Sequence, residues 1–104
     1  MVVYKIEFYK KALKKLPNIK AAGLKDKLYF LIEIIRNNPY QIPPYYEKLT
    51  GDMSEYYSRR INIQHRLVYQ VLEEEKIVKV LSIWSHYEDI KKILEDNDEY
   101  EVIP

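Results

Sequence analysis

The sequence predicts a small α+β domain in which an antiparallel sheet packs on two N-terminal helices, with the order βααβββ and a final short helix. Five leucine and isoleucine residues recur at helical spacing between residues 24 and 35, which is typical of an amphipathic helix with one buried stripe. Segments 56–63, 65–73 and 77–84 are rich in β-branched and aromatic residues, which favours strands. The length of 104 residues fits one compact core.

The N-terminal third should contain one strand and both helices. Residues 2–8, VVYKIEF, have the composition of a short strand. The following KKALKKLP predicts a short helix that stops at Pro17, and Asn18 is then placed to cap the next helix. The long amphipathic helix should run from Leu24 to about Arg36.

Residues 37–52 carry the clearest loop signal of the chain. Three prolines lie between positions 39 and 44, and proline excludes regular structure over most of such a segment. We expect this loop to be stiff and to display its tyrosines and Glu47 rather than bury them.

The three predicted strands after the loop should form the centre of the sheet. In segment 65–73 both alternating faces are mostly apolar, so we expect a central strand covered on one side by the long helix. His65 shares a face with apolar neighbours and is interpreted as structural. The EEEK run, residues 73–76, should form a turn, and residues 87–94 a last short helix.

Composition excludes several function classes. The chain has no cysteine, which removes disulfides, thiolate metal sites and cysteine nucleophiles. Its two glycines, Gly23 and Gly51, are too few for a phosphate-cradling loop. Two histidines 21 positions apart make a weak metal proposal, so we expect no metal or other cofactor. No apolar run could span a bilayer or serve as a signal peptide, so we expect a soluble, cytoplasmic protein without a membrane partner.

The charge is divided unevenly along the chain. Residues 1–87 hold 15 Lys and Arg against 9 Asp and Glu, whereas residues 88–104 hold 2 Lys against 7 acidic residues. A basic body suits a polyanionic partner, although lysines that only solvate helix faces give the same count. We therefore expect a functional domain over 1–87 followed by a short helix and an acidic tail over 88–104. One hypothesis is that the tail lies over the basic surface and weakens the binding of that polyanionic partner.

The remaining polar residues match metal-independent RNA cleavage. Arg66 lies in the predicted central strand, and arginine is almost never buried there without a partner. That partner is either a loop acid such as Glu47, in a purely structural salt bridge, or a ligand. His86 follows the last strand and can donate a proton near neutral pH. An acid, an arginine and a histidine are the groups that transesterification at a phosphate requires.

The motif SRRIN-x-x-HRLVY, residues 58–69, followed by a strand and SHY, resembles the YoeB (Txe/YoeB) toxins of the RelE superfamily. The resemblance covers residues 2–87. It implies a microbial-ribonuclease-like fold and an endoribonuclease toxin that cleaves mRNA on the ribosome. It also implies a cognate antitoxin that occupies the active site, and self-association into homodimers.

The resemblance also assigns roles to individual residues. The catalytic acid falls on Glu47 and the catalytic arginine on Arg66. The catalytic histidine and its tyrosine fall on His86 and Tyr87. The residues that the resemblance places at RNA or phosphate are Tyr57, at a position often occupied by Trp, and the pair Arg59 and Arg60, for which a structural ion pair is the alternative.

This chain departs from the family at three points. The loop before Glu47 lacks the family's glycines, Thr50 replaces a frequent lysine, and the tail extends beyond the usual end. Two other functions stay open. One is a ParE-like toxin that is not a nuclease, and the other is a catalytically weak binding module that acts through antitoxin complexes and operon regulation.

Overall fold

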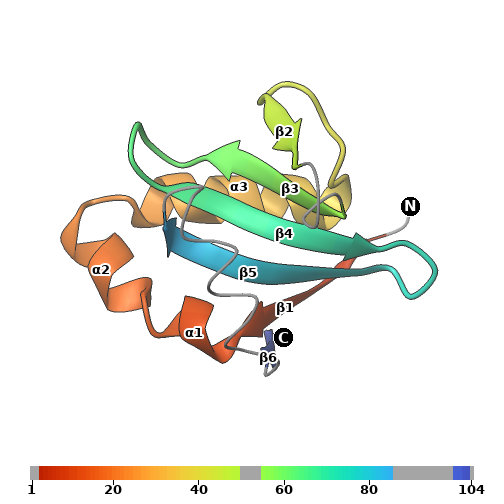
Figure 1. Cartoon of the computed structure of the whole chain (residues 1–104), viewed down its shortest axis with the longest axis horizontal. Coiled ribbons are helices and arrows are strands. Elements are labelled where there is room, and N and C mark those ends of the chain that lie inside the picture. The colour runs from red at the N-terminus through yellow and green to blue at the C-terminus, as the bar shows by residue number, and fades with distance from the viewer. Residues whose placement is uncertain (1–2, 50–54, 86–99, 104) are drawn as a thin grey trace.

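The computed structural model describes residues 3–49, 55–85 and 100–103, which form one sheet with helices on one of its faces (Figure 1). In chain order the elements are β1 (Lys5–Tyr9), α1 (Lys10–Leu13), α2 (Leu16–Ala21), α3 (Lys25–Asn37), β2 (Tyr46–Lys48), β3 (Tyr56–Arg60), β4 (Arg66–Leu72), β5 (Ile77–Ser85) and β6 (Tyr100–Ile103). The predicted α+β domain, with a sheet on N-terminal helices, is confirmed.

The six strands lie in the order β2-β3-β4-β5-β1-β6. The pairs from β2 to β5 are antiparallel, as predicted, but β1 runs parallel to β5, with Lys5 opposite Ile77 and Phe8 opposite Val80. The prediction of a wholly antiparallel sheet is therefore wrong at this pair. A tight hairpin after β1 would have fixed an antiparallel neighbour for it. Helices follow β1 instead, so its direction relative to β5 was not determined locally.

The predicted central strand is confirmed as β4, which lies between β3 and β5. Its residues Leu67 and Tyr69 pack with α3, and Val68 packs on the opposite face. The β4–β5 register is irregular on both sides of Val68, and Ser85 at the end of β5 lies opposite Arg66. Such bulges bend a strand and re-aim its side chains.

The long helix α3 lies where its apolar spacing predicts, but the first helices differ from the prediction. Pro17 does not stop a helix; it lies in the first turn of α2, where a missing N–H costs no hydrogen bond. Asn18 is inside α2, and the N-cap is Lys15. Gly23, at φ +73°, ends α2. Its N–H donates to the Lys20 carbonyl while that of Leu24 donates to the Ile19 carbonyl, a helix end that favours glycine.

The proline-rich segment contains a strand that the sequence did not indicate. Most of it is irregular, but Tyr46–Lys48 forms the edge strand β2 and pairs with β3. Glu47 is therefore held by a sheet register and is not on a free loop. A strand of three residues is too short for its alternation to be recognised.

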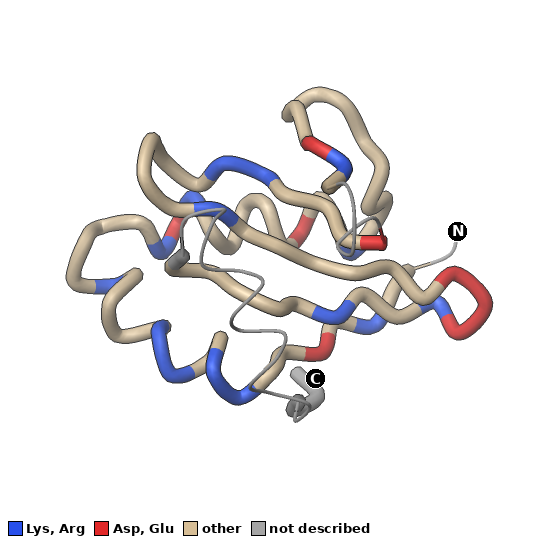
Figure 2. The backbone as a smooth tube through the Cα atoms, in the orientation of Figure 1, with Lys and Arg blue, Asp and Glu red and all other residues tan. Residues whose placement is uncertain are grey.

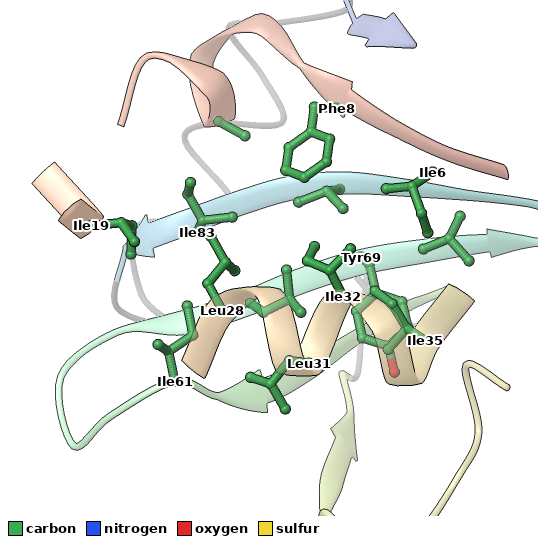
Figure 3. Close-up of a cluster of buried hydrophobic side chains, with 14 of the residues drawn as sticks. Ile6, Phe8, Ile19, Leu28, Leu31, Ile32, Ile35, Ile61, Tyr69 and Ile83 are labelled. Atoms are coloured by element: carbon green, nitrogen blue, oxygen red, sulfur yellow. The ribbon is translucent and has the colours of Figure 1, made fainter. Parts of the chain in front are cut away.

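Side chains from the helices and the sheet form the main core (Figure 3). Ile6 of β1, Leu28 of α3 and Tyr69 of β4 are among its fully buried members. A smaller cluster of Leu49, Tyr56, Val68 and Leu81 lies on the other sheet face. Because the helices cover only one face, part of the second face is left for a site.

The last described strand, β6, pairs antiparallel with β1 and places Ile103 opposite Ile6. The helix predicted over residues 87–94 lies outside the described residues. None of the helices in the described part of the chain is long and apolar enough to cross a bilayer.

Candidate active site

Strand register brings Glu47, Ser58, Arg60 and Arg66 to one face of the sheet. Glu47 lies opposite Ser58, and Arg60 lies opposite Arg66. Residues two apart in a strand share a face, so Ser58 and Arg60 point the same way. Val68, two residues from Arg66, belongs to the cluster on the face away from α3. The four polar side chains therefore lie on the face that the helices do not cover.

Arg66 and Glu47 form the centre of this group. Arg66 Nη1 lies 3.3 Å from Glu47 Oε1 and 3.4 Å from Ser58 Oγ. The Arg66 side chain is 25% exposed and that of Glu47 49% exposed, so both remain accessible from solvent. The predicted salt bridge thus forms. Its geometry is compatible with both alternatives, a structural pair and an acid and a cation that act on one bound phosphate.

A cleft of about 650 Å³ opens over this pair. Arg60, Arg66 and Lys27 of α3 contribute three cationic side chains to its lining, against the single carboxylate of Glu47. This excess of positive charge suits an anionic ligand. Its remaining walls come from the loop before β2 and the turn after β3, where Tyr45 and Ile63 are exposed. Figure 2 shows basic positions on β3 and at the start of β4, and one acidic and one basic position on the neighbouring strand β2.

Arg59 does not take part in this cleft. It points to the helix-covered face, is 1% exposed, and donates hydrogen bonds to the carbonyls of Pro39, Gln41 and Pro44 and to the Tyr69 hydroxyl, at 2.6 to 3.1 Å. Burial raises the pKa of Tyr69 to about 12, against the opposing effect of the Arg59 charge. Of the two roles considered for Arg59, phosphate contact is wrong; it is structural, although its partners are backbone carbonyls and not an acid.

Tyr57 also lies away from the cleft. It shares the helix-covered face with Arg59, and its ring stacks on that of Tyr69 at 5.7 Å. The rings of Tyr40 and Tyr46 meet the Tyr57 ring edge-on, with centroids 5.9 and 5.6 Å from it. Burial is the main cause that raises the pKa of Tyr57. Alternation along β3 turns Tyr57 away from the cleft, so the structure does not bring it together with Glu47 and Arg66, and its contact with RNA stays a prediction.

The histidines divide as follows. The His65 ring stacks on Trp84 at 3.8 Å, and its Nδ1 lies 3.1 Å from the Trp84 carbonyl oxygen, which confirms the structural interpretation. His86 and Tyr87 lie outside the described residues. Ser85, the residue before His86, is the register partner of Arg66.

Two lining residues were missed from the sequence. Ser58 is buried and shares Arg66 with Glu47, and only the pairing of β2 with β3 reveals this. Lys27 comes from a helix far away in the sequence. Among the described residues, no group of three or more His, Cys, Asp or Glu side chains could hold a metal ion.

Comparison with known proteins identifies the family by sequence. The model of the YoeB-like toxin of bacterial type II toxin–antitoxin systems matches residues 9–87. A curated relative, toxin YoeB from Synechocystis sp., is 34% identical over 65 residues, which are 62% of this chain and 73% of the relative.

Solved structures agree with this match. A YoeB/ParE toxin from Agrobacterium tumefaciens superimposes with a TM-score of 0.71 at 29% identity, over 80% of this chain and 99% of that one. The YoeB dimer from Staphylococcus aureus gives 0.68 at 31%, over 83% and 100% of the two chains. The YoeB–YefM complex from the same organism gives 0.67 at 32%, over 81% and 98%.

Proposed function

Since this chain belongs to the YoeB-like toxins of bacterial type II toxin–antitoxin systems, we propose that it is an endoribonuclease that cleaves mRNA on the ribosome. The observation that supports this most is the Glu47–Arg66 pair, 3.3 Å apart on an open sheet face under a cationic cleft. A pair with only a structural role would not require the further cations Lys27 and Arg60 around it.

The proposed reaction is a transesterification that needs no metal. Glu47 accepts the proton of the ribose 2′-hydroxyl as its oxygen attacks the adjacent phosphorus. Arg66 donates hydrogen bonds to the phosphorane oxygens, whose negative charge grows during the attack. His86, with Tyr87 beside it in the sequence, gives a proton to the departing 5′-oxygen. The products are a 2′,3′-cyclic phosphate and a free 5′-hydroxyl.

The surroundings of the pair support an RNA substrate. Arg60 is exposed beside Arg66 and can contact a flanking phosphate, and Lys27 adds a cation from the other wall. Tyr45 offers an exposed ring at the entrance, a surface on which a base can stack. Neither Tyr57 nor Arg59 is part of these surroundings.

The proposed partners are the mRNA, the ribosome and an antitoxin, with the cytoplasm as the site of action. Relatives of this fold were solved as a YoeB–YefM complex and as a YoeB dimer. By analogy we propose a cognate antitoxin that silences the toxin, and a homodimer.

The experiment that tests this function is a map of mRNA cuts during translation. Purified protein is added to translating ribosomes with a defined mRNA, and the 5′ ends of the fragments are mapped. Wild type should give discrete cuts in the decoding site, and Arg66→Ala and His86→Ala should give none. Cuts that survive in both variants would refute the residue roles. Ribosome binding without any cut would favour the binding module. Arrest of growth on expression without any RNA cut would favour a ParE-like toxin.

A further inference from the structure

One part of the cleft lining takes no role in the proposed proton transfers. Glu47 and Arg66 form their pair in the cleft, while Tyr45 and Ile63 line it from two separate segments, the loop before β2 and the turn after β3. Tyr45 is 74% exposed and Ile63 88% exposed. Two large apolar side chains in the lining of one hollow form a surface that a flat, apolar group can cover.

The position of Tyr45 relative to Glu47 indicates which group that is. Tyr45 immediately precedes β2, and Glu47 follows two residues later. Two residues of extended chain span about 7 Å and share a face. In the proposed reaction Glu47 takes the proton of the attacking 2′-hydroxyl, so the ribose that carries this hydroxyl lies at Glu47. The base of the same nucleotide is then within reach of the Tyr45 ring.

The turn of residues 61–65 holds Ile63 in a fixed place. The N–H groups of Ile61 and Asn62 donate hydrogen bonds to the His65 carbonyl oxygen, at 2.9 and 3.2 Å. Asn62 Oδ1 accepts two more, from the N–H groups of Gln64 at 2.9 Å and His65 at 2.7 Å. These hydrogen bonds close the turn from both sides of Ile63, which is therefore presented to the cleft by a fixed backbone.

The same hydrogen bonds determine the orientation of the Asn62 amide. Because two backbone N–H groups occupy Oδ1, its acceptor capacity is used within the turn. Nδ2 has no hydrogen-bond partner in the part of the chain that the structure describes, and Asn62 lines the cleft. To a ligand in the cleft, Asn62 therefore offers two N–H donors and no free acceptor.

A side chain that only donates distinguishes the two purine bases. Guanine has two adjacent acceptors, O6 and N7, whereas adenine carries an amino group in place of O6. The two bases have the same ring size, so they gain equally from stacking. Asn62 Nδ2 therefore favours guanine over adenine by the edge of the base alone.

We propose that Tyr45, Asn62 and Ile63 form a guanine subsite for the nucleotide on the 5′ side of the cut. This inference rests on the proposed nuclease function, because that reaction places the ribose of this nucleotide at Glu47. Tyr45 and Ile63 hold the base between an aromatic and an aliphatic side chain, and Asn62 Nδ2 donates hydrogen bonds to O6 and N7. The three residues select the substrate and transfer no proton.

The test compares guanine with adenine at the base 5′ to a mapped cut. Single-turnover cleavage is followed on ribosomes programmed with two mRNAs that differ only in this base, and wild type should cleave the guanine mRNA at least about fivefold faster. Asn62→Asp keeps an oxygen for the turn but replaces the two donors by an acceptor, so the guanine preference should disappear or reverse. Gln64→Glu adds the same charge to the same turn without lining the cleft and should keep the wild-type preference.

The contact with the faces of the base is tested separately. Tyr45→Ala and Ile63→Ala should each slow cleavage by at least about threefold with either base, while the guanine preference stays. Ile42→Ala is the control, because Ile42 belongs to the same proline-rich loop and is exposed but does not line the cleft, so both rates should match wild type. Wild-type rates in Tyr45→Ala and Ile63→Ala would contradict the proposed contacts.

A binding measurement separates this inference from the nuclease proposal. Two short labelled RNAs carry 2′-deoxyguanosine or 2′-deoxyadenosine at their centre in identical flanks, so neither can be cut there. Fluorescence anisotropy should show about fivefold tighter binding of the guanine RNA, and Asn62→Asp should lose this preference. Equal affinity for the two RNAs, or no binding of either, would overturn the guanine subsite even if wild type cleaves mRNA. A guanine preference in binding without any mRNA cleavage would refute the nuclease alone.

Discussion

Two adjacent arginines of β3 have opposite environments. Arg59 is buried under the proline-rich loop and its guanidinium holds that loop through three backbone carbonyls. Arg60 is exposed and lines the cleft. Strand alternation alone separates them, and the loop that Arg59 holds leads directly into β2 and Glu47. Arg59 therefore supports the site without touching it.

Replacing Arg59 should destabilise the fold, whereas replacing Arg60 should not. Arg59→Met leaves buried carbonyls without donors, and each charge-assisted hydrogen bond is worth about 1.5–3 kcal/mol. We expect the free energy of unfolding to fall by about 3 kcal/mol or more. Arg60→Met should stay within about 0.5 kcal/mol of wild type. Urea unfolding curves measure both, and equal small losses would show that the Arg59 contacts contribute little.

Ser58 should act by positioning Arg66. Ser58→Ala removes a weak hydrogen bond to Nη1, whose worth is about 0.5–1.5 kcal/mol, so cleavage should slow by about two- to tenfold. Because Ser58 is buried and bonds to Arg66, its effect should pass through Arg66, so KM for RNA should stay constant while kcat falls. A change confined to KM would argue against this role. Ser82→Ala is the control, since Ser82 is also buried in the sheet but does not line the cleft.

Among the elements, the turn between β4 and β5 is tied to the N-terminus and to the proline-rich loop. The Glu73 carboxylate accepts hydrogen bonds from Tyr40 at 2.8 Å, from Tyr4 at 2.9 Å, and from Lys76. Lys76 adopts φ +57°, a left-handed conformation that is unfavourable for residues other than glycine and asparagine. Its contact with Glu73 offsets part of that cost.

Glu73 should make stability depend on pH in the acid range. Hydrogen bonds from Lys76, Tyr40 and Tyr4 lower the pKa of Glu73 from 4.5 to about 2. A lowered pKa in the folded state means that the contribution is fully present above pH 4.5 and is lost as pH falls towards 2. Urea midpoints of wild type and Glu73→Gln should therefore differ at pH 6 and converge near pH 2. A difference that stays constant over this range would contradict the assignment.

Helices and strands with a strong hydrophobic periodicity could be located from the sequence, whereas short or unpatterned ones could not. Leu28, Leu31 and Ile35 mark α3 unambiguously, and both apolar faces of β4 identify the central strand. The role of Pro17 could not be settled, since proline both precedes and opens helices. The three-residue β2 has no detectable alternation, and the direction of β1 depends on long-range packing that no local signal records.

For the molecule as a whole, the cleft and β6 lie towards opposite edges of the sheet. β2, β3 and β4 carry the cleft, while Tyr100–Ile103 pairs with β1 beyond β5. The acidic run 95–99, on which the hypothesis of a tail over the basic RNA surface depends, lies outside the described residues, and residues 100–103 pair with β1 rather than lie over the cleft. These residues instead cover the backbone edge of β1. Without them, the N–H and C=O groups on that edge would be open to pairing with another chain.

Removal of β6 should promote self-association. A chain ending at residue 99 leaves the outer backbone groups of β1 without a partner strand. We expect sedimentation velocity to show a larger, concentration-dependent species than for wild type, whereas removal of Pro104 alone should change nothing. Identical sedimentation of all three forms would mean that the edge is protected in another way.

The meeting of Glu47 with Arg66 was predictable, but the rest of the arrangement was not. The resemblance to the YoeB toxins pointed to both residues, Glu47 by its spacing from the SRR motif and Arg66 by HRLVY, and the two side chains do meet. The faces of Tyr57 and Arg59 could not be predicted, because alternation gives only relative faces and the packed helix fixes which face is covered. Lys27 enters from a helix, which no motif in the strands could indicate.

The central claim is that Glu47 and Arg66 act together on the scissile phosphate. Single-turnover cleavage by Glu47→Ala, Arg66→Ala and the double variant tests it most directly. Loss of either group should slow cleavage by about 10²–10³-fold, and the double variant should be little slower than the worse single one, since residues that act as a unit are not additive. Single variants that cleave within about threefold of wild type, with structure intact, would show that the pair is only a salt bridge.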